Sequence, residues 1–150
     1  MIVVGVDGSE GGAAALEFAA EEAALRQDRL RIVSAWEVPV AAFSAGAAPP
    51  LDTALVDAIR VRAEQIADEA VATAKRLQPS LQVDAVTVAG QPADALLAQG
   101  ADGDLIVVGR RGLGGFRSLL LGSVSQQVVH HAPCPVVVVP HETDRHGAAR

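Results

Sequence analysis

Five short apolar runs, each rich in β-branched residues, alternate along the chain with longer segments of helical character. The runs cover residues 2–6, 30–36, 83–88, 105–108 and 136–139, and the helical segments cover 11–27, 51–77, 92–99 and 123–131. Strands that alternate with helices favour a parallel sheet covered on both faces, which also accounts for strands that are continuously apolar. The sequence therefore predicts a three-layer α/β fold with an open, five-stranded parallel sheet.

Length and composition indicate one domain with an aliphatic core. At 150 residues the chain is long enough to bury a core and too short for two ordinary domains. Half of the residues are hydrophobic but only 3% are aromatic, so Val, Leu, Ile and Ala must fill the interior. We expect one domain over residues 1–140, followed by a polar C-terminal tail over 141–150.

Charge and hydropathy argue against several classes of partner. The net charge of −6 disfavours a general nucleic-acid binder, because phosphate backbones require a basic surface. No stretch reaches the roughly 18 apolar residues that cross a bilayer, and no charged-then-apolar leader is present. We therefore expect a cytoplasmic protein with no membrane partner. The single cysteine, Cys134, excludes an internal disulfide and is expected to be a small buried residue.

A glycine-rich loop joins the fourth apolar run to the last helical segment. It runs from Gly109 to Gly122, and the helical pattern starts at Ser123. A helix N-terminus presents unpaired N–H groups, here those of Ser123, Val124 and Ser125, and the positive end of the helix dipole. Such a junction suits an anion, so the loop predicts a phosphate site of a nucleotide. The alternative is an ordinary turn with Ser123 as the helix N-cap.

The residue types within this loop have functional interpretations. Gly109 and Gly112 are expected to take positive φ and to let the backbone approach a ligand. Val at Gly109 or at Gly122 would then fill the phosphate space, so it should abolish binding and leave the fold largely intact. Arg110, Arg111 and Arg117 place three cations in an acidic protein, although arginines on a surface usually lie solvated.

A second loop, residues 7–12, follows the first apolar run. Ligands of open parallel sheets bind beyond the carboxyl ends of the strands, so the two loops would face each other if the first and fourth strands are neighbours. Asp7 would then contact ribose hydroxyls or a phosphate-bound metal, or it would shape the turn before the first helix. The backbone of Ala35 and Trp36, at the end of the second strand, could bond an adenine edge, although Trp36 is equally suited to the core.

The sequence lacks the P-loop and dinucleotide-binding motifs and shows no evident hydrolase site. It contains no G-x-x-x-x-G-K-[ST], and Arg117 stands where the last glycine of G-x-G-x-x-G would be. No Ser/His/Asp arrangement or metal-ligand spacing of histidines is visible. His130 lies about 12 Å along the helix from Gly122, too far to act as a base at a phosphate. The sequence therefore favours a binding site over an enzyme. A separate loop, residues 39–50, either covers a ligand or simply links two elements.

The spacing G-x2-G-x9-G-[ST], read here as Gly109, Gly112, Gly122 and Ser123, resembles the nucleotide signature of the universal stress proteins. The likeness covers nearly the whole chain: residues 2–9, 112–124 and 131–139 also match. It implies a sheet with strand order 3-2-1-4-5. It also implies bound ATP with Mg²⁺ or Mn²⁺, the metal being held mainly by the phosphates, with Asp7 as a further candidate ligand.

The resemblance also implies which residues meet the nucleotide. Positions of Gly5, Asp7 and Ala35 would contact adenine and ribose, whereas residues 109–115 and 123–125 would hold ribose and phosphates. Arg110 stands where a small Ser is frequent, so it either adds a phosphate contact or crowds the ribose. The candidate site residues are Gly5, Asp7, Ala35, Gly109, Arg110, Arg111, Gly112, Gly115, Gly122, Ser123, Val124 and Ser125.

The leading hypothesis is an ATP-binding stress-response protein in which the nucleotide acts mainly as a regulatory ligand. The alternatives are a slow metal-dependent ATPase, a cyclic AMP-binding protein and a nucleotide-independent interaction module, the last disfavoured by the intact glycines. The family's edge strand, Val136–Val139 here, pairs antiparallel with a second subunit. The resemblance therefore implies a homodimer, and an unpaired apolar edge strand invites such association.

Overall fold

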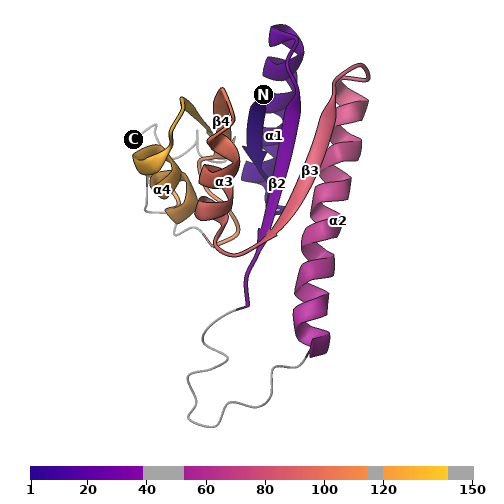
Figure 1. Cartoon of the computed structure of the whole chain (residues 1–150), viewed down its shortest axis with the longest axis vertical. Coiled ribbons are helices and arrows are strands. Elements are labelled where there is room, and N and C mark those ends of the chain that lie inside the picture. The colour runs from indigo at the N-terminus through magenta and orange to yellow at the C-terminus, as the bar shows by residue number, and fades with distance from the viewer. Residues whose placement is uncertain (39–52, 115–119, 142–150) are drawn as a thin grey trace, which may run out of the picture.

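The computed structural model describes residues 1–38, 53–114 and 120–141 (Figure 1). These residues form the strands β1 (Ile2–Gly5), β2 (Leu30–Trp36), β3 (Val83–Ala89), β4 (Leu105–Gly109) and β5 (Val136–Val139). The helices are α1 (Glu10–Arg26), α2 (Thr53–Leu77), α3 (Pro92–Gly100) and α4 (Ser123–His131). The expected elements are confirmed, with ends that differ by one or two residues. The loop 39–50 and the tail beyond His141 lie outside the described residues.

The five strands form one parallel sheet in the order β3-β2-β1-β4-β5, which confirms the expected fold class and order. β1 lies in the centre, where Ile2 pairs with Leu30 of β2 on one side and with Leu105 of β4 on the other. The strand order reverses between β1 and β4. The loops that follow these two strands therefore meet at one edge of the sheet, as the sequence predicts.

The helices cover the two faces of the sheet in pairs. α1 and α2 pack on the face that presents Val4 and Ile32, whereas α3 and α4 pack on the face that presents Val3 and Ile106. Because side chains alternate between the two faces of a strand, the central strands are buried on both sides. The buried hydrophobic side chains in the described residues are all Val, Leu, Ile or Ala, as the composition predicts.

β2 extends further than β1 at the carboxyl edge of the sheet. The pairing between them ends at Val33, whose carbonyl also accepts a hydrogen bond from the Val6 N–H (3.0 Å). β2 continues to Trp36, whose carbonyl accepts from the Gly90 N–H on the side of β3 (2.8 Å). Backbone groups of successive strand residues point to opposite sides. The N–H and C=O of Ala35 therefore point toward the side of β1, where β1 has already ended.

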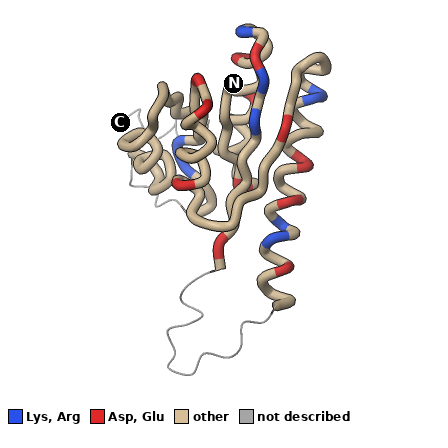
Figure 2. The backbone as a smooth tube through the Cα atoms, viewed as in Figure 1, with Lys and Arg blue, Asp and Glu red and all other residues tan. Residues whose placement is uncertain are grey.

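The long helix α2 carries its charges along its solvent-exposed side. Figure 2 shows acidic and basic residues interspersed along α2. Arg60 bonds Glu64 one turn further on (2.6 Å) and lies 3.6 Å from Asp57. The face toward the sheet instead carries the buried residues Ala63, Ala67, Ala70 and Ala74. None of the described helices is both long and apolar enough to span a bilayer.

Cys134 packs beside the cluster of apolar residues under α3 and α4. It is half-buried, so it is less enclosed than the sequence predicts. Burial raises the pKa of its thiol above the usual value. The thiol is therefore protonated at neutral pH, which fits a packing role.

Candidate functional site

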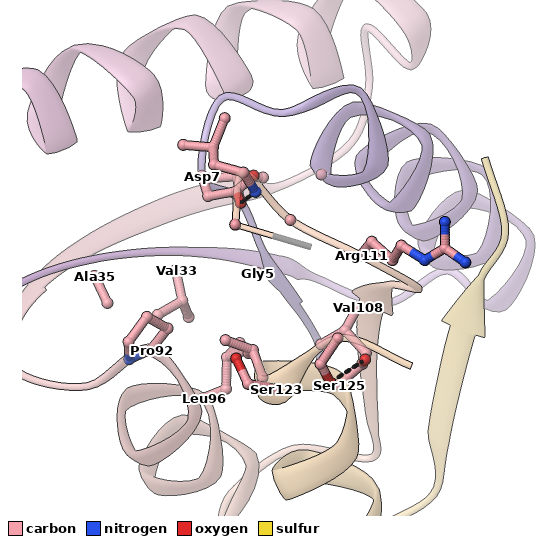
Figure 3. Close-up of a pocket in the computed structure, with 18 of the residues that line it drawn as sticks. Gly5, Asp7, Val33, Ala35, Pro92, Leu96, Val108, Arg111, Ser123 and Ser125 are labelled. Atoms are coloured by element: carbon pink, nitrogen blue, oxygen red, sulfur yellow. Dashed lines mark hydrogen bonds between the residues drawn. The ribbon is translucent and has the colours of Figure 1, made fainter. Parts of the chain in front are cut away.

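A cavity of about 660 Å³ lies at the carboxyl edge of the sheet, a size that is typical of small-molecule sites (Figure 3). It is bounded by the ends of β1, β2 and β4 and by the first turns of α3 and α4. In Figure 3, Val33, Ala35 and Pro92 lie together at one end of the cavity, and Ser125 lies toward the other. The cavity therefore spans the region between the end of β2 and the start of α4.

The structure brings most of the predicted site residues to this cavity. Those that line it are Gly5, Asp7, Ala35, Gly109, Arg111, Gly112, Gly122, Ser123, Val124 and Ser125. Arg110 is not among the described residues that line it, and its guanidinium Nε donates instead to the Leu120 carbonyl (2.6 Å). Figure 3 shows the Arg111 guanidinium directed away from the end of the cavity at Ala35 and Pro92. Gly115 and Arg117 lie outside the described residues.

The carboxylate of Asp7 ties the two loops together. Its Oδ1 accepts hydrogen bonds from the Ser9 N–H (2.9 Å) and from the Ser9 hydroxyl. Its Oδ2 accepts from the Leu113 N–H of the facing loop (3.2 Å). The turn-shaping alternative for Asp7 is therefore present in the structure, and the same side chain also holds the loop after β4.

Gly109 and Gly112 are small for a reason other than the predicted one. The glycines with positive φ among the described residues are Gly8 (φ 80°) and Gly90 (φ 133°), so positive φ at Gly109 and Gly112 is a wrong expectation. A Cβ at Gly109 would lie 2.5 Å from the carbonyl oxygen of Gly11, and one at Gly112 would overlap the Asp7 carboxylate. Both glycines permit close packing of the two loops.

This packing also corrects the expected effect of a substitution at Gly109. The space beside its Cα holds the backbone of α1 and not a phosphate. A Val at this position would therefore force α1 and the loop apart, and it would not leave the fold intact. Gly122 differs, because a Cβ there would meet its nearest neighbour, the Arg110 carbonyl oxygen, at 3.4 Å.

The first turn of α4 is open toward the cavity. Its N-cap is Gly122, in extended backbone, and no side chain caps the helix. Ser123 is the first helical residue, so the alternative in which it is the N-cap is wrong. The first intrahelical bond runs from the Gln126 N–H to the Gly122 carbonyl (3.0 Å), which leaves the three preceding N–H groups without an intrahelical partner. This end of the helix can accept an anion.

The hydroxyl of Ser125 has a structural role. Ser125 is buried, and its Oγ lies 3.0 Å from both the Arg110 and the Gly122 carbonyl oxygens. One hydroxyl proton serves these acceptors, so it is already engaged within the protein. Of the two serine hydroxyls expected at a phosphate, that of Ser125 is thus bonded within the protein.

At the other end of the cavity, Ala35 presents a donor and an acceptor of its own backbone. β1 has ended before this point, and no bond from another described residue reaches these groups on that side. Val33, Pro92 and Leu96 add an apolar wall beside them. A flat ring with an adjacent donor and acceptor on one edge would contact the apolar wall with its faces and form hydrogen bonds with both backbone groups.

The sequence analysis missed four residues of this end: Val33, Glu37, Pro92 and Leu96. Pro92 opens the helix that follows β3, and β3 ends at the same edge of the sheet as β1 and β4. The rule that ligands bind beyond the carboxyl ends of parallel strands would therefore have identified Pro92. Leu96 sits under Gly5, because a Cβ on Gly5 would lie only 2.9 Å from its Cδ1, and this contact has no counterpart in the sequence pattern.

The described residues contain no group of three or more His, Cys, Asp or Glu side chains that could hold a metal ion. Asp7 bonds the glycine loop at Leu113, and both of its carboxylate oxygens accept protein hydrogen bonds. The protein groups seen here therefore do not build a metal site by themselves. A metal ion in this cavity would depend on ligands from a bound molecule.

Comparison with known sequences identifies relatives along almost the whole chain. Residues 1–140 match the model of the universal stress protein family. A Thermus aquaticus protein, the universal stress protein in the QAH/OAS sulfhydrylase 3′ region, is 41% identical over 140 residues, which are 92% of this chain and 96% of the relative. A universal stress protein of Mycobacterium tuberculosis is 37% identical over 138 residues; they cover 91% of this chain but only 44% of that longer protein.

Solved structures share the architecture. UspA from Lactobacillus plantarum superposes with a TM-score of 0.76 at 26% identity, covering 92% of this chain and 95% of that one. A universal stress protein in complex with cAMP gives 0.68 at 28% identity over 92% and 94% of the two chains. One from Archaeoglobus fulgidus in complex with dAMP gives 0.62 at 25% over 92% and 95%. The chain belongs to the universal stress protein family.

Proposed function

We propose that this protein binds an adenine nucleotide in the cavity at the carboxyl edge of its sheet. The observation that carries the proposal is that two complementary sets of backbone groups line one cavity: those of Ala35 at one end and the open first turn of α4 at the other. Solved relatives in complex with cAMP and with dAMP support an adenine nucleotide as the ligand class. ATP is the particular ligand that we propose.

The two ends of the cavity define how the ligand lies. Adenine carries an amino donor beside a ring-nitrogen acceptor, which matches the C=O and N–H of Ala35, and its faces would contact Val33 and Pro92. The phosphates lie at the first turn of α4, where the N–H groups and the helix dipole favour negative charge. Mg²⁺ or Mn²⁺ accompanies them, held by phosphate oxygens, because Asp7 already bonds Ser9 and Leu113.

The nucleotide acts as a regulatory ligand in this proposal and not as a substrate. The cavity supplies anion-binding groups, and among the described residues that line it Asp7 and Glu37 are the titratable carboxylates. Asp7 holds the two loops together through its hydrogen bonds, and Glu37 lies at the end of the cavity where adenine is proposed. Bound nucleotide would instead stabilise the loop after β4 in the position that a partner protein recognises.

The deciding experiment asks what the purified protein binds. Protein prepared without added nucleotide, and protein equilibrated with Mg-ATP, is denatured and its released small molecules are separated by chromatography. We expect an adenine nucleotide in the second sample at about one per chain, and calorimetric titrations with ATP, AMP, cAMP and GTP rank the affinities. If adenine nucleotides are released by neither sample and give no heat, the proposal is wrong; sustained release of phosphate from ATP would favour an ATPase.

We also propose a homodimer formed through the outer edge of β5. The Ile106 N–H donates to the Pro135 carbonyl (3.0 Å), and the Arg110 N–H donates to the Val139 carbonyl (2.8 Å). The backbone groups of Pro135 and Val139 therefore point toward β4. By alternation, the backbone groups of Val136 and Val138 point away from β4, toward the outer edge. A second copy of β5 would pair with them.

Proline scanning tests this interface with a matched pair of variants. Val138→Pro removes an outward N–H and should yield a folded monomer, whereas Val137→Pro removes an N–H that faces β4 and should destabilise the fold by about 3 kcal/mol. Light scattering after size-exclusion chromatography reports the mass. A wild-type monomer, or a Val138→Pro protein that remains dimeric, would contradict the assignment.

A further inference from the structure

We propose that Arg110 is a positioning residue for the nucleotide, acting by holding the returning arm of the glycine loop, residues 120–125, against the end of β4. The inference rests on the proposed function, because it is that ligand whose affinity Arg110 would set. It assigns to Arg110 neither the phosphate contact nor the crowding of the ribose that the sequence raises. The side chain would affect the ligand through Leu120 and the residues that follow it.

The backbone of Arg110 already joins three segments that are distant in the sequence. Its N–H donates to the Val139 carbonyl of β5 (2.8 Å). Its carbonyl accepts from the Gly122 N–H (2.9 Å), and the buried hydroxyl of Ser125 lies 3.0 Å away. Arg110 is thus the point where the end of β4 meets β5 and the start of α4.

The side chain adds a further tie to the same arm. Its Nε donates to the Leu120 carbonyl at 2.6 Å, a short bond from a charged donor. The next residues, Leu121 and Gly122, line the cavity, as do Ser123 and Val124. The Arg110 side chain therefore holds the chain immediately before the segment whose N–H groups are proposed to receive the phosphates.

A held arm lowers the cost of binding. The N–H groups of an α4 start that is already in place lose less conformational freedom when a ligand arrives. A small residue at position 110 would retain the backbone bonds but lose the tie to Leu120. Affinity would then fall without the loss of any direct contact to the ligand.

Two substitutions distinguish the effect of the hydrogen bond to Leu120 from the effect of the positive charge. The Nε2 of Gln lies the same number of bonds from Cα as the Nε of Arg, so Arg110→Gln keeps a donor there and removes the positive charge. Arg110→Met keeps a side chain of similar length and places a methyl group at that point. If Arg110 acts through Leu120, Gln should replace it; if it attracts phosphates by charge, Gln and Met should be equally defective.

The first measurement is calorimetric titration of wild type and both variants with ATP and Mg²⁺. We expect Arg110→Gln to bind within about twofold of wild type and Arg110→Met to bind about three- to tenfold more weakly, the effect of one lost hydrogen bond. Thermal unfolding of each variant reports whether the fold is kept. Equal loss in both variants, or no loss in Arg110→Met, would overturn the inference.

The second measurement needs no nucleotide. Amide hydrogen exchange of the ligand-free proteins should be faster over residues 120–125 in Arg110→Met than in wild type, while Arg110→Gln should match wild type. Unchanged exchange in Arg110→Met overturns the positioning role even if nucleotide binds. If the exchange pattern is as expected but the protein binds no adenine nucleotide, Arg110 holds residues 120–125 and the proposed function is wrong.

Discussion

The first turns of α1 and α4 occupy equivalent places in the fold but differ in how their N-termini are capped. Each follows one of two neighbouring parallel strands, β1 and β4, and each starts at the same edge of the sheet. α1 is capped by the Ser9 hydroxyl, which accepts from the Gly12 N–H (3.1 Å), and it carries Glu10 in its first turn. α4 starts at Gly122 with no side-chain cap and no acidic residue in its first turn.

This difference shows which of the two helix ends is suited to a ligand. At α1 the protein supplies the hydroxyl and the negative charge that a helix N-terminus favours. At α4 it supplies neither, and the end opens on the cavity. The glycine loop delivers the chain to α4 without a capping side chain, so a bound anion would complete that helix.

The largest expected effect comes from disturbing the place where the two regions touch. Gly109→Val would place its Cβ 2.5 Å from the Gly11 carbonyl oxygen and should destabilise the protein by about 3 kcal/mol. Urea unfolding gives the value. Gly114→Ala is the control, because among the described residues no atom beyond its chain neighbours lies within 4 Å of a Cβ at that position. Its change should stay within about 0.5 kcal/mol. Equal stabilities of the two variants would refute the packing role.

The next effect tests the open end. Ser123→Asp gives α4 the first-turn acid that α1 already has, so its fold should gain about 0.5 kcal/mol. The same carboxylate would lie where phosphates are proposed, so nucleotide should bind about tenfold more weakly or worse. Titration calorimetry and thermal unfolding give the two values. Unchanged affinity would mean that this helix end is not the phosphate site.

A smaller effect is expected at the capped end. Ser9→Ala removes the hydroxyl that bonds Gly12 and Asp7, and should cost about 1 kcal/mol of stability. The affinity for nucleotide should change less than for Ser123→Asp, because α1 is not the proposed phosphate site. Denaturant unfolding and titration of the same preparation test this. A larger loss of affinity than of stability would show that the two helix starts act together on the ligand.

The smallest effect concerns the charge at α1. Glu10 is exposed and lies 3.4 Å from the ring of His141. Glu10→Gln should lower stability by about 0.3 kcal/mol at low ionic strength, and the loss should disappear in 1 M salt, where charges are screened within roughly 3 Å. Thermal unfolding at the two salt concentrations measures it. A loss that persists at high salt would have a cause other than the helix dipole.

The sequence predicts the fold well because its pattern is local. Continuous apolar runs separated by helical segments identify every strand and helix of the described residues, and the resemblance to a family implied the strand order. The meeting of the loops after β1 and β4 follows from that order. One expectation that depends on contacts across the sheet was wrong: Gly109 lacks positive φ, and its small size lets the loop pack against Gly11. The bond from the Leu113 N–H to Asp7, which is 106 residues away, has no counterpart in the sequence pattern.

The apolar end of the cavity shows a further limit of sequence patterns. Leu96 and Val33 look like ordinary core residues in their elements, and the structure shows that they also line the cavity. Ser125 is the opposite case. Its hydroxyl resembles a phosphate ligand in the sequence, but its burial under the Arg110 carbonyl assigns the proton to the protein.

The fit of Leu96 against Gly5 offers a route to a protein with altered ligand choice. Gly5 has no side chain, and Leu96 occupies the space that a Cβ would need, next to the wall proposed for the base. Shortening this leucine to alanine would enlarge the cavity beside that wall. A synthetic nucleotide with a bulky group on its base would fit the enlarged cavity of the variant and would be excluded by Leu96 in the natural protein.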